Sequence, residues 1–488
     1  MADFLEIDLE TVKKRAVRGV LALTGRTFLL QIISFFGFFL LTVFLGRGEI
    51  GLFFAVSELV AILGYFSDIG LAAALIQKKG KPEIKDIRST FTIQQILVLM
   101  LVVLIFIFTP WLRNFYNISQ EGIYLLWALT LSFFLASLKT IPSVLLERQL
   151  RFDLLVVVEI VETLLFYIIA VALAWRGLGV ISYAWAVLIR GLAGVVLIYL
   201  LSPWQIGFAF ETGSLKHLLK FGVPYQANTF LAVIKDRLMN VFLWKIIGAE
   251  GVGILGWAQK WAQMPLRLAM DAVMKVTFPA YARMQEDKRE LSLAIEKTLF
   301  FLSLVTFPML AGMLVLAKPL VQLIPRYGKW EIALIALYFF IINSLWGAVT
   351  TPLTNALTAI GKIKTVFKLM VMWTILTWIV YPVLAIRFGF NGVAFGAAVV
   401  ATSSIIAIWV IKKEIKFKFL SSIMAPLIAS LIMGSLVLLL RSILAKSIFG
   451  IVMLTALGGI VYFTLIFLIT GKKFIDDIKG ILYALKTR

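Results

Sequence analysis

Fourteen stretches of mostly apolar residues recur along this chain of 488 residues. A helix needs about 20 such residues to cross a bilayer, and backbone in lipid must satisfy its hydrogen bonds internally. The chain can therefore fold into little else than a bundle of spanning helices, and we expect an all-α polytopic membrane protein. The predicted spans are 21–45, 51–77, 91–112, 122–144, 154–175, 179–201, 221–247, 251–280, 298–324, 331–357, 365–387, 391–411, 421–440 and 447–470.

Composition agrees with this prediction and excludes several other functions. Hydrophobic residues make up 61% of the chain, whereas soluble domains contain about 45–50%. The net charge of +21 is typical of cytoplasmic loops next to anionic lipid. We expect no nucleic-acid partner, because no basic segment resembles a binding module. With no Cys and one His, the chain offers no Cys/His metal site, and we predict no cofactor.

The positive charges of the loops predict the orientation. Alternate gaps and both tails hold 27 of the Lys and Arg residues near the span ends, and the opposite gaps hold 9. The positive-inside rule therefore places both termini in the cytoplasm. An even number of spans is consistent with that placement.

A repeated unit indicates two related halves. The stretch Leu45–Gln77 returns as Ile247–Tyr281, and Gly51 corresponds to Gly253. Each half has six spans, so the halves enter the membrane from the same side, as in parallel repeats. The predicted organisation is an interfacial segment at 1–20, a first lobe at 21–201, a cytoplasmic linker at 202–220, a second lobe at 221–411, and two further spans with a cytoplasmic tail at 412–488.

Polar and charged side chains within spans are the candidate functional residues. Charges in lipid are costly and usually face a bundle interior or a watery cavity. The candidates are Arg26, Glu58, Asp68, Asp236, Arg237, Asn240, Lys260, Arg267, Asp271 and Lys275. The last four share one helical stripe. They suggest a cationic cavity between the halves, suited to phosphate or carboxylate, which Arg binds in bidentate fashion.

These charges have a second interpretation, in which they pair and hold helices in register. Asp236 with Arg237, and Arg267 with Asp271, could be simple salt bridges. For the charges of spans 5 and 6 we favour this structural interpretation, which applies to Glu159, Glu162 and Arg190. We predict an ion pair between Glu162 and Arg190.

An enzymatic function is not expected. Membrane glycosyltransferases and polymerases need sizeable outside loops with acids or His, and every predicted outside gap here is short. No nucleotide-binding motif that would support direct ATP drive is present. Transport by alternating access remains, driven by an ion gradient, the membrane potential or the cargo's own gradient.

Four stretches resemble a known superfamily in their order and spacing. They are Leu45–Lys79, Leu145–Asp153 followed by the turn Gly177–Val180, Lys245–Lys260 leading to Val276–Leu291, and Phe307–Ala333. Together they resemble the multidrug/oligosaccharidyl-lipid/polysaccharide exporter superfamily, and within it the polysaccharide flippases of the O-antigen and teichuronic-acid type.

The resemblance implies a V-shaped pair of six-helix lobes with two peripheral helices, in the cell membrane. It implies transfer of a lipid-diphosphate-linked oligosaccharide or polysaccharide repeat unit from the inner to the outer leaflet. The implied partners are this polyprenyl-diphosphate-linked glycan, membrane lipids and other glycan-assembly proteins. Arg26 lies where such flippases often carry a cation. Ile50-Gly51 departs from the usual aromatic-glycine pair, and no His or Cys in the spans is available for coupling.

Three alternatives stay open. A drug/cation antiporter of the same fold should carry more acidic than basic cavity residues, which this sequence does not. A peptidoglycan lipid II flippase would have the same number of spans. A non-transporting scaffold of a glycan-assembly complex would leave the charges within the spans without a role.

Overall fold

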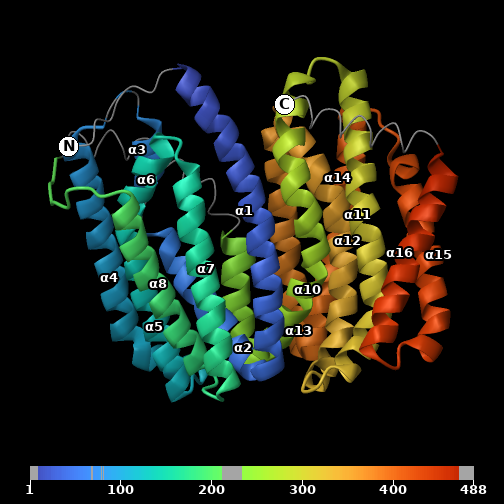
Figure 1. Cartoon of the computed structure of the whole chain (residues 1–488), viewed down its shortest axis with the longest axis horizontal. Helices are drawn as coiled ribbons and strands as arrows, with labels where there is room; N and C mark the ends of the chain where they lie inside the picture. Colours follow the sequence, from blue (N-terminus) through green and yellow to red (C-terminus); the bar gives the residue numbers. More distant parts are fainter. Residues whose placement is uncertain (1–8, 68–69, 79, 81, 212–232, 472–488) are drawn as a thin grey trace. The chain divides into compact units, whose positions relative to one another are not determined.

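The computed structural model consists of helices and their connections, without a strand, in the residues that it describes: 9–67, 70–78, 80, 82–211 and 233–471 (Figure 1). For 9–24, 271–272 and 275–276 it describes the backbone alone. Twelve helices in this described part are long and apolar enough to cross a membrane. The predicted all-α polytopic fold is therefore confirmed.

Two glycines explain why twelve long helices stand where fourteen spans were predicted. Helices α10 (Met239–Arg283) and α13 (Ile363–Thr402) each contain one non-helical residue, Gly248 with φ +70° and Gly389 with φ +59°. Only glycine adopts such a backbone without strain. Both breaks fall between predicted spans. Divided at these glycines, the twelve candidate spans become fourteen segments, one for each predicted span.

The chain forms two compact units, Met1–Gly253 and Ile254–Arg488. The division falls within α10, beyond the predicted linker at 202–220. The helices of the first unit are α1 (Leu9–Phe44), α2 (Arg47–Tyr65), α3 (Leu71–Gln77), α4 (Ile84–Tyr116), α5 (Gln120–Leu138), α6 (Thr140–Arg148), α7 (Phe152–Trp175), α8 (Ile181–Leu201), the π-helical turn η1 (Val233–Leu238) and the start of α10. Helix α1 is continuous, so the described residues of the predicted interfacial segment extend the first span.

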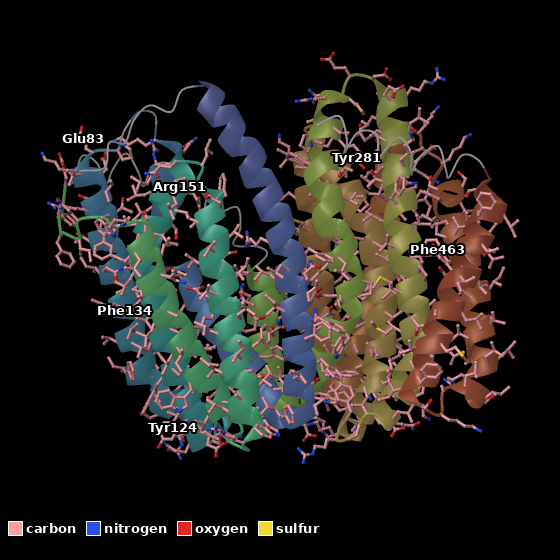
Figure 2. All side chains as sticks on the ribbon, viewed as in Figure 1. Glu83, Tyr124, Phe134, Arg151, Tyr281 and Phe463 are labelled. Carbon is pink, nitrogen blue, oxygen red and sulfur yellow. The ribbon has the colours of Figure 1, made fainter. Side chains whose placement is uncertain are left out.

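Neighbouring helices of the first unit pack in a chain of contacts. Helix α7 packs against α1 and α8, α8 against α5, and α5 against α2 and α4. Large apolar side chains remain exposed on both units, for example Tyr124 on α5 and Phe463 on α16 (Ile448–Thr470) (Figure 2). Such exposure is expected where the surrounding solvent is lipid.

Two predicted spans are each broken into a long and a short helix. The stretch 51–77 divides into α2 and α3, and the stretch 122–144 divides into α5 and α6. Helices α3 and α6 pack against each other near the beginning of α4 (Figure 1). The predicted span 122–144 still lies within one candidate membrane span, Gln120–Arg148, whereas 51–77 extends past the end of its span at Tyr65, because an apolar-run template does not detect a local break.

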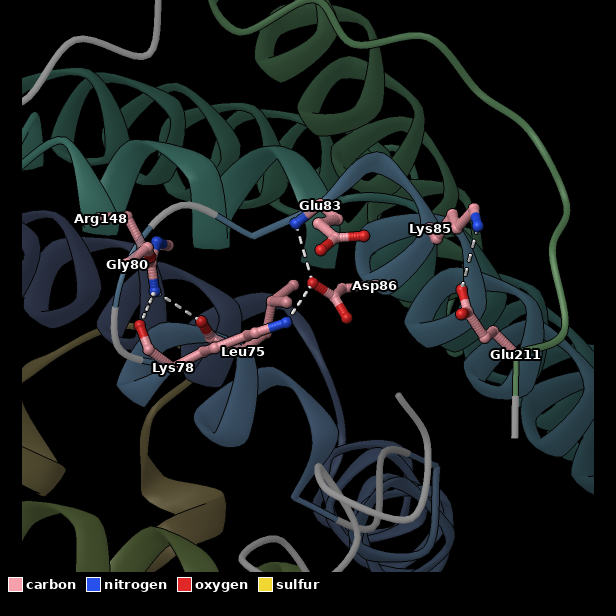
Figure 3. Close-up of polar contacts among 8 residues, drawn as sticks. All are labelled: Leu75, Lys78, Gly80, Glu83, Lys85, Asp86, Arg148 and Glu211. Carbon is pink, nitrogen blue, oxygen red and sulfur yellow. Dashed lines mark hydrogen bonds and ion pairs between the residues drawn. The ribbon is translucent and has the colours of Figure 1, made fainter. Parts of the chain in front are cut away.

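Arg148, which lies in the stretch Leu145–Asp153 of the family resemblance, connects α6 to the end of α3 (Figure 3). Its guanidinium donates hydrogen bonds to the carbonyl oxygens of Leu75, Ile76, Lys78 and Gly80. The last carbonyls of a helix have no intrahelical partner, and Arg148 supplies one for α3. The side chain of Lys78 forms an ion pair with the buried Asp86 of α4. Arg148 therefore has a structural role.

Helix α2 packs closely against the beginning of α10 through glycines. A Cβ on Gly51 would lie 1.7 Å from the Ala249 carbonyl oxygen and 2.5 Å from the Gly253 nitrogen. Arg47 and Glu250 form an ion pair of 2.9 Å beside this contact. The two glycines that the predicted repeat aligns, Gly51 and Gly253, thus lie against each other in the first unit.

The second unit is built around α11. Its elements are the remainder of α10, α11 (Lys288–Leu323), the 3₁₀ turn η2 (Gly328–Ala333), α12 (Leu334–Ala359), α13, α14 (Ile405–Glu414), α15 (Phe419–Leu444) and α16. Helix α11 packs against α12, α15 and α16. The buried Tyr462 hydroxyl donates to the Leu304 carbonyl oxygen at 2.8 Å. Helices α15 and α16, which lie outside the predicted repeat, therefore pack directly against α11 within this unit.

Candidate functional site: charged side chains within the spans

Three of the predicted lining residues fall outside what the structure describes. Asp68 lies in the undescribed connection between α2 and α3, and the side chains of Asp271 and Lys275 on α10 are likewise not described. The remaining candidates belong to one or the other unit, and each unit has its own arrangement.

Arg237 in η1 reaches across to Glu58 in α2. Its Nη1 lies 3.0 Å from Glu58 Oε2, and the two side chains are 44% and 29% exposed. A π-helical turn is uncommon and often marks a functional position. The contact uses one terminal nitrogen of a guanidinium that carries five N–H donors. Two predicted candidates, 179 positions apart, thus meet in the first unit.

Asp236 does not take the role that its position beside Arg237 suggested. Its carboxylate lies 3.3 Å from Lys235 Nζ and its side chain is 63% exposed. The hypothesis of a pair between Asp236 and Arg237 is therefore wrong, because Arg237 binds Glu58 instead. Asn240 is half-buried one turn further along, in the first turn of α10.

Arg26 in α1 contacts Glu159 in α7. The two side chains are partly exposed, and they bridge two helices that pack along their length. Sequence reasoning had assigned Arg26 to the transport cavity and Glu159 to helix packing. In the structure both residues take part in one ion pair.

Glu162 in α7 has two cationic neighbours. Lys139, between α5 and α6, makes the closer contact, to Glu162 Oε1. The predicted partner, Arg190 in α8, has its Nε 3.9 Å from Oε2. The side chain of Glu162 is 5% exposed, that of Lys139 19% and that of Arg190 46%. Lys139 therefore holds the carboxylate, and Arg190 lies at its more open side.

Small residues make room for this cluster. A Cβ on Gly194 of α8 would lie 1.5 Å from Glu162 Oε1, so the glycine leaves the space that the carboxylate occupies in this arrangement. Lys139, Glu162 and Arg190 line a cavity of about 270 Å³ that is also bordered by residues of α2 and α5. Sequence reasoning missed Lys139, although it lies within the predicted span 122–144, five residues from its end.

In the second unit, Lys260 and Arg267 lie on one side of α10, seven positions apart. Arg267 is exposed, and its Nη2 donates to Gln263 Oε1 at 3.1 Å. Lys260 is half-buried. The helix continues through Pro265. Among the described side chains of this unit, no carboxylate forms an ion pair with Arg267.

The candidates therefore divide into two kinds. Glu58, Glu159 and Glu162 are each held by a cation, which lowers the cost of placing them in a membrane. Arg190 and Arg267 present guanidinium donors that no described carboxylate binds closely. A guanidinium with donors that no acid occupies, in a membrane-spanning segment, is suited to binding an oxyanion.

Solved structures of known proteins share this fold. The chain superposes on the lipid II flippase MurJ, in its inward closed conformation, with a TM-score of 0.74 over 93% of this chain and 100% of that one, at 18% identity. An inward-facing multidrug resistance MATE family transporter gives a TM-score of 0.53 over 78% of this chain, at 19% identity. The fold is that of the MOP superfamily of membrane transporters.

The family follows from the sequence match. Residues 40–334, more than half of the chain, match the family described as "Polysaccharide biosynthesis protein", and the chain belongs to it. The succinoglycan biosynthesis transport protein ExoT of Rhizobium meliloti is 23% identical over 99% of this chain and 98% of its own length. The teichuronic acid biosynthesis protein TuaB of Bacillus subtilis is 24% identical over 62% of each chain.

Proposed function

We propose that this protein is a flippase that moves lipid-diphosphate-linked oligosaccharide or polysaccharide repeat units from the inner to the outer leaflet of the cell membrane. The observation that carries the proposal is Arg267, a cation within a span whose described hydrogen bond goes to the neutral Gln263, in a chain from this family. ExoT is named a transport protein and MurJ a flippase, which supports transport rather than an enzymatic reaction.

In this proposal the cations bind the diphosphate of the cargo. Arg267 and Lys260 share one side of α10, and Lys275 continues the same stripe in the sequence. Arg237 keeps donors beyond the one that binds Glu58. Guanidinium pairs with phosphate oxygens through parallel hydrogen bonds, so each arginine can bind the diphosphate without a metal ion or cofactor. Other glycan-assembly proteins are the proposed protein partners.

The proposed orientation has both termini in the cytoplasm. It rests on the excess of Lys and Arg in alternate connections, 27 against 9. The lipid-linked cargo would then be loaded from the side on which it is synthesised, and released on the other side by alternating access.

The test is flipping in proteoliposomes with a fluorescent polyprenyl-diphosphate oligosaccharide. We expect Arg267→Ala and Arg237→Ala to lose transport while their reconstituted amounts stay normal. Exposed arginines give matched controls, Arg387→Ala in the second unit and Arg176→Ala in the first, and both should transport like the wild type. Full transport by both site variants would refute the assignment of these cations.

The same proteoliposome assay distinguishes this function from the alternative functions. Efflux of cationic dyes under an ion gradient, without glycan flipping, would identify a drug antiporter. Flipping confined to lipid II would identify a peptidoglycan flippase. If wild-type vesicles move none of these cargoes, a scaffold role in glycan assembly becomes the better explanation.

A further inference from the structure

The cavity of the first unit has the size of one sugar and lies among four helices. Its volume is about 270 Å³, and it is bordered by α2, α5, α7 and α8. At about 30 Å³ for each water molecule, it could hold roughly nine of them or one hexose. Small residues such as Ala61 and Gly64 border it on α2, and Phe133 on α5 contributes an aromatic ring to the lining.

The charges at the cavity leave one cation without a close partner. Lys139 contacts Glu162 directly, whereas Arg190 is 3.9 Å from the same carboxylate, too far for a hydrogen bond. In the part of the chain that the structure describes, no acceptor forms a hydrogen bond with the Arg190 guanidinium, which lies 5.9 Å from the centre of the Phe166 ring. The cavity lining therefore carries a net charge of +1, from two cations and one acid.

The neighbouring charges do not cancel this excess. Arg26 and Glu159 lie near the cluster and form an ion pair with each other, so they contribute no net charge. An uncompensated charge in a membrane interior is costly, and an anion that enters the cavity would compensate it. The hydroxyl of Ser57, also in the lining, is buried and has no hydrogen-bond partner among the described residues.

From this geometry we propose that the cavity is a binding site for one anionic sugar group, a carboxylate or a phosphate monoester on a body no larger than a hexose. Arg190 supplies the paired donors for the anion, Ser57 supplies one further polar contact, and Phe133 faces the apolar side of the sugar ring. Lys139 is a positioning residue that occupies Glu162, so that this carboxylate does not neutralise Arg190. The source of the sugar rests on the proposed function, because an acidic residue of the cargo glycan would meet these requirements.

Binding is tested on the purified full-length chain in neutral detergent by titration calorimetry. The probes are glucuronate, glucose 6-phosphate, and glucose as the neutral match. A charge-assisted hydrogen bond favours the anions over glucose by about tenfold or more. We expect Arg190→Gln to remove this preference and Arg190→Lys to restore part of it. We also expect Ala61→Leu, which fills the cavity without changing a charge, to abolish binding. Arg176→Gln is the matched control and should bind like the wild type.

Three results would overturn the proposal. The first is equal binding of glucose and glucuronate, and the second is unchanged anion binding by both Arg190→Gln and Ala61→Leu. The third is a site that binds anionic lipid and none of the sugar probes. Proteoliposomes then connect the site to transport, because Arg190→Gln should slow flipping of a glucuronate-containing cargo and leave a neutral cargo unaffected. If wild-type vesicles flip neither cargo, the proposed function fails while the binding result still stands by itself.

Discussion

Replacing Lys139 with Met should destabilise the first unit more than replacing Arg190 does. Lys139 contacts the carboxylate of Glu162, whose side chain is 5% exposed, so Lys139→Met leaves a buried charge with a distant partner. Breaking a buried ion pair costs about 3–5 kcal/mol of unfolding free energy. Because Arg190 still partly compensates Glu162, we expect a loss of about 3 kcal/mol. Arg190 is 46% exposed, so solvent screening limits the loss for Arg190→Met to about 1 kcal/mol.

The assay is thermal melting of detergent-solubilised variants. At about 2 °C per kcal/mol for a cooperative body of this size, Lys139→Met should lower the midpoint by about 6 °C and Arg190→Met by about 2 °C. The double variant Lys139→Met/Glu162→Gln should recover most of the loss, because it removes the buried carboxylate and leaves only Arg190, which at 46% exposed is accessible to solvent. Lys85→Met, at a side chain 69% exposed, is the control and should change little. Equal losses for Lys139 and Arg190, or additive losses in the double variant, would refute the reasoning.

Three further predictions test the packing and the orientation. Gly51→Ala places a methyl group against backbone that cannot move aside, and should cost about 1–3 kcal/mol in melting assays; Gly48→Ala, with open space around it, should be neutral. Arg148→Met leaves four carbonyl acceptors without their donor and should lower the amount of folded protein, as read by size-exclusion chromatography. Because the chain has no cysteine, single cysteines at Lys362 and Arg176 report topology cleanly. An impermeant maleimide added to intact cells should label the second and not the first, and the reverse result would invert the orientation.

The fold could be predicted from sequence because lipid imposes a simple rule on length and polarity. Each crossing needs one long apolar run, so the number of segments is readable without knowledge of packing. The breaks before α3 and α6 could not be read in this way. Gly70 adopts φ +75° before α3, and Lys139 separates α5 from α6, but both lie inside otherwise continuous apolar runs.

The candidate site was only partly predictable, for a physical reason. The spacing of charges tells which face of one helix they share, but not which helix lies opposite that face. Sequence alone could therefore select Glu58 and Arg237 but not pair them across 179 positions. Lys139 was overlooked because a lysine near the end of a span is usually interpreted as reaching the interface. Its importance depends on Glu162, which only the folded unit brings to it.

The distinction between held and available cations separates stability from binding. A cation that contacts a buried acid, as Lys139 contacts Glu162, offsets a cost that the fold would otherwise bear, so its loss should appear in melting. A cation such as Arg267 forms its described hydrogen bond with the neutral Gln263 and contacts no acid among the described side chains, so its loss should appear in transport. Arg190 lies between these cases, since it is near Glu162 but does not bind it closely. It should therefore show a small effect on melting together with a large effect on anion binding, a combination that neither a purely structural residue nor an isolated surface charge would give.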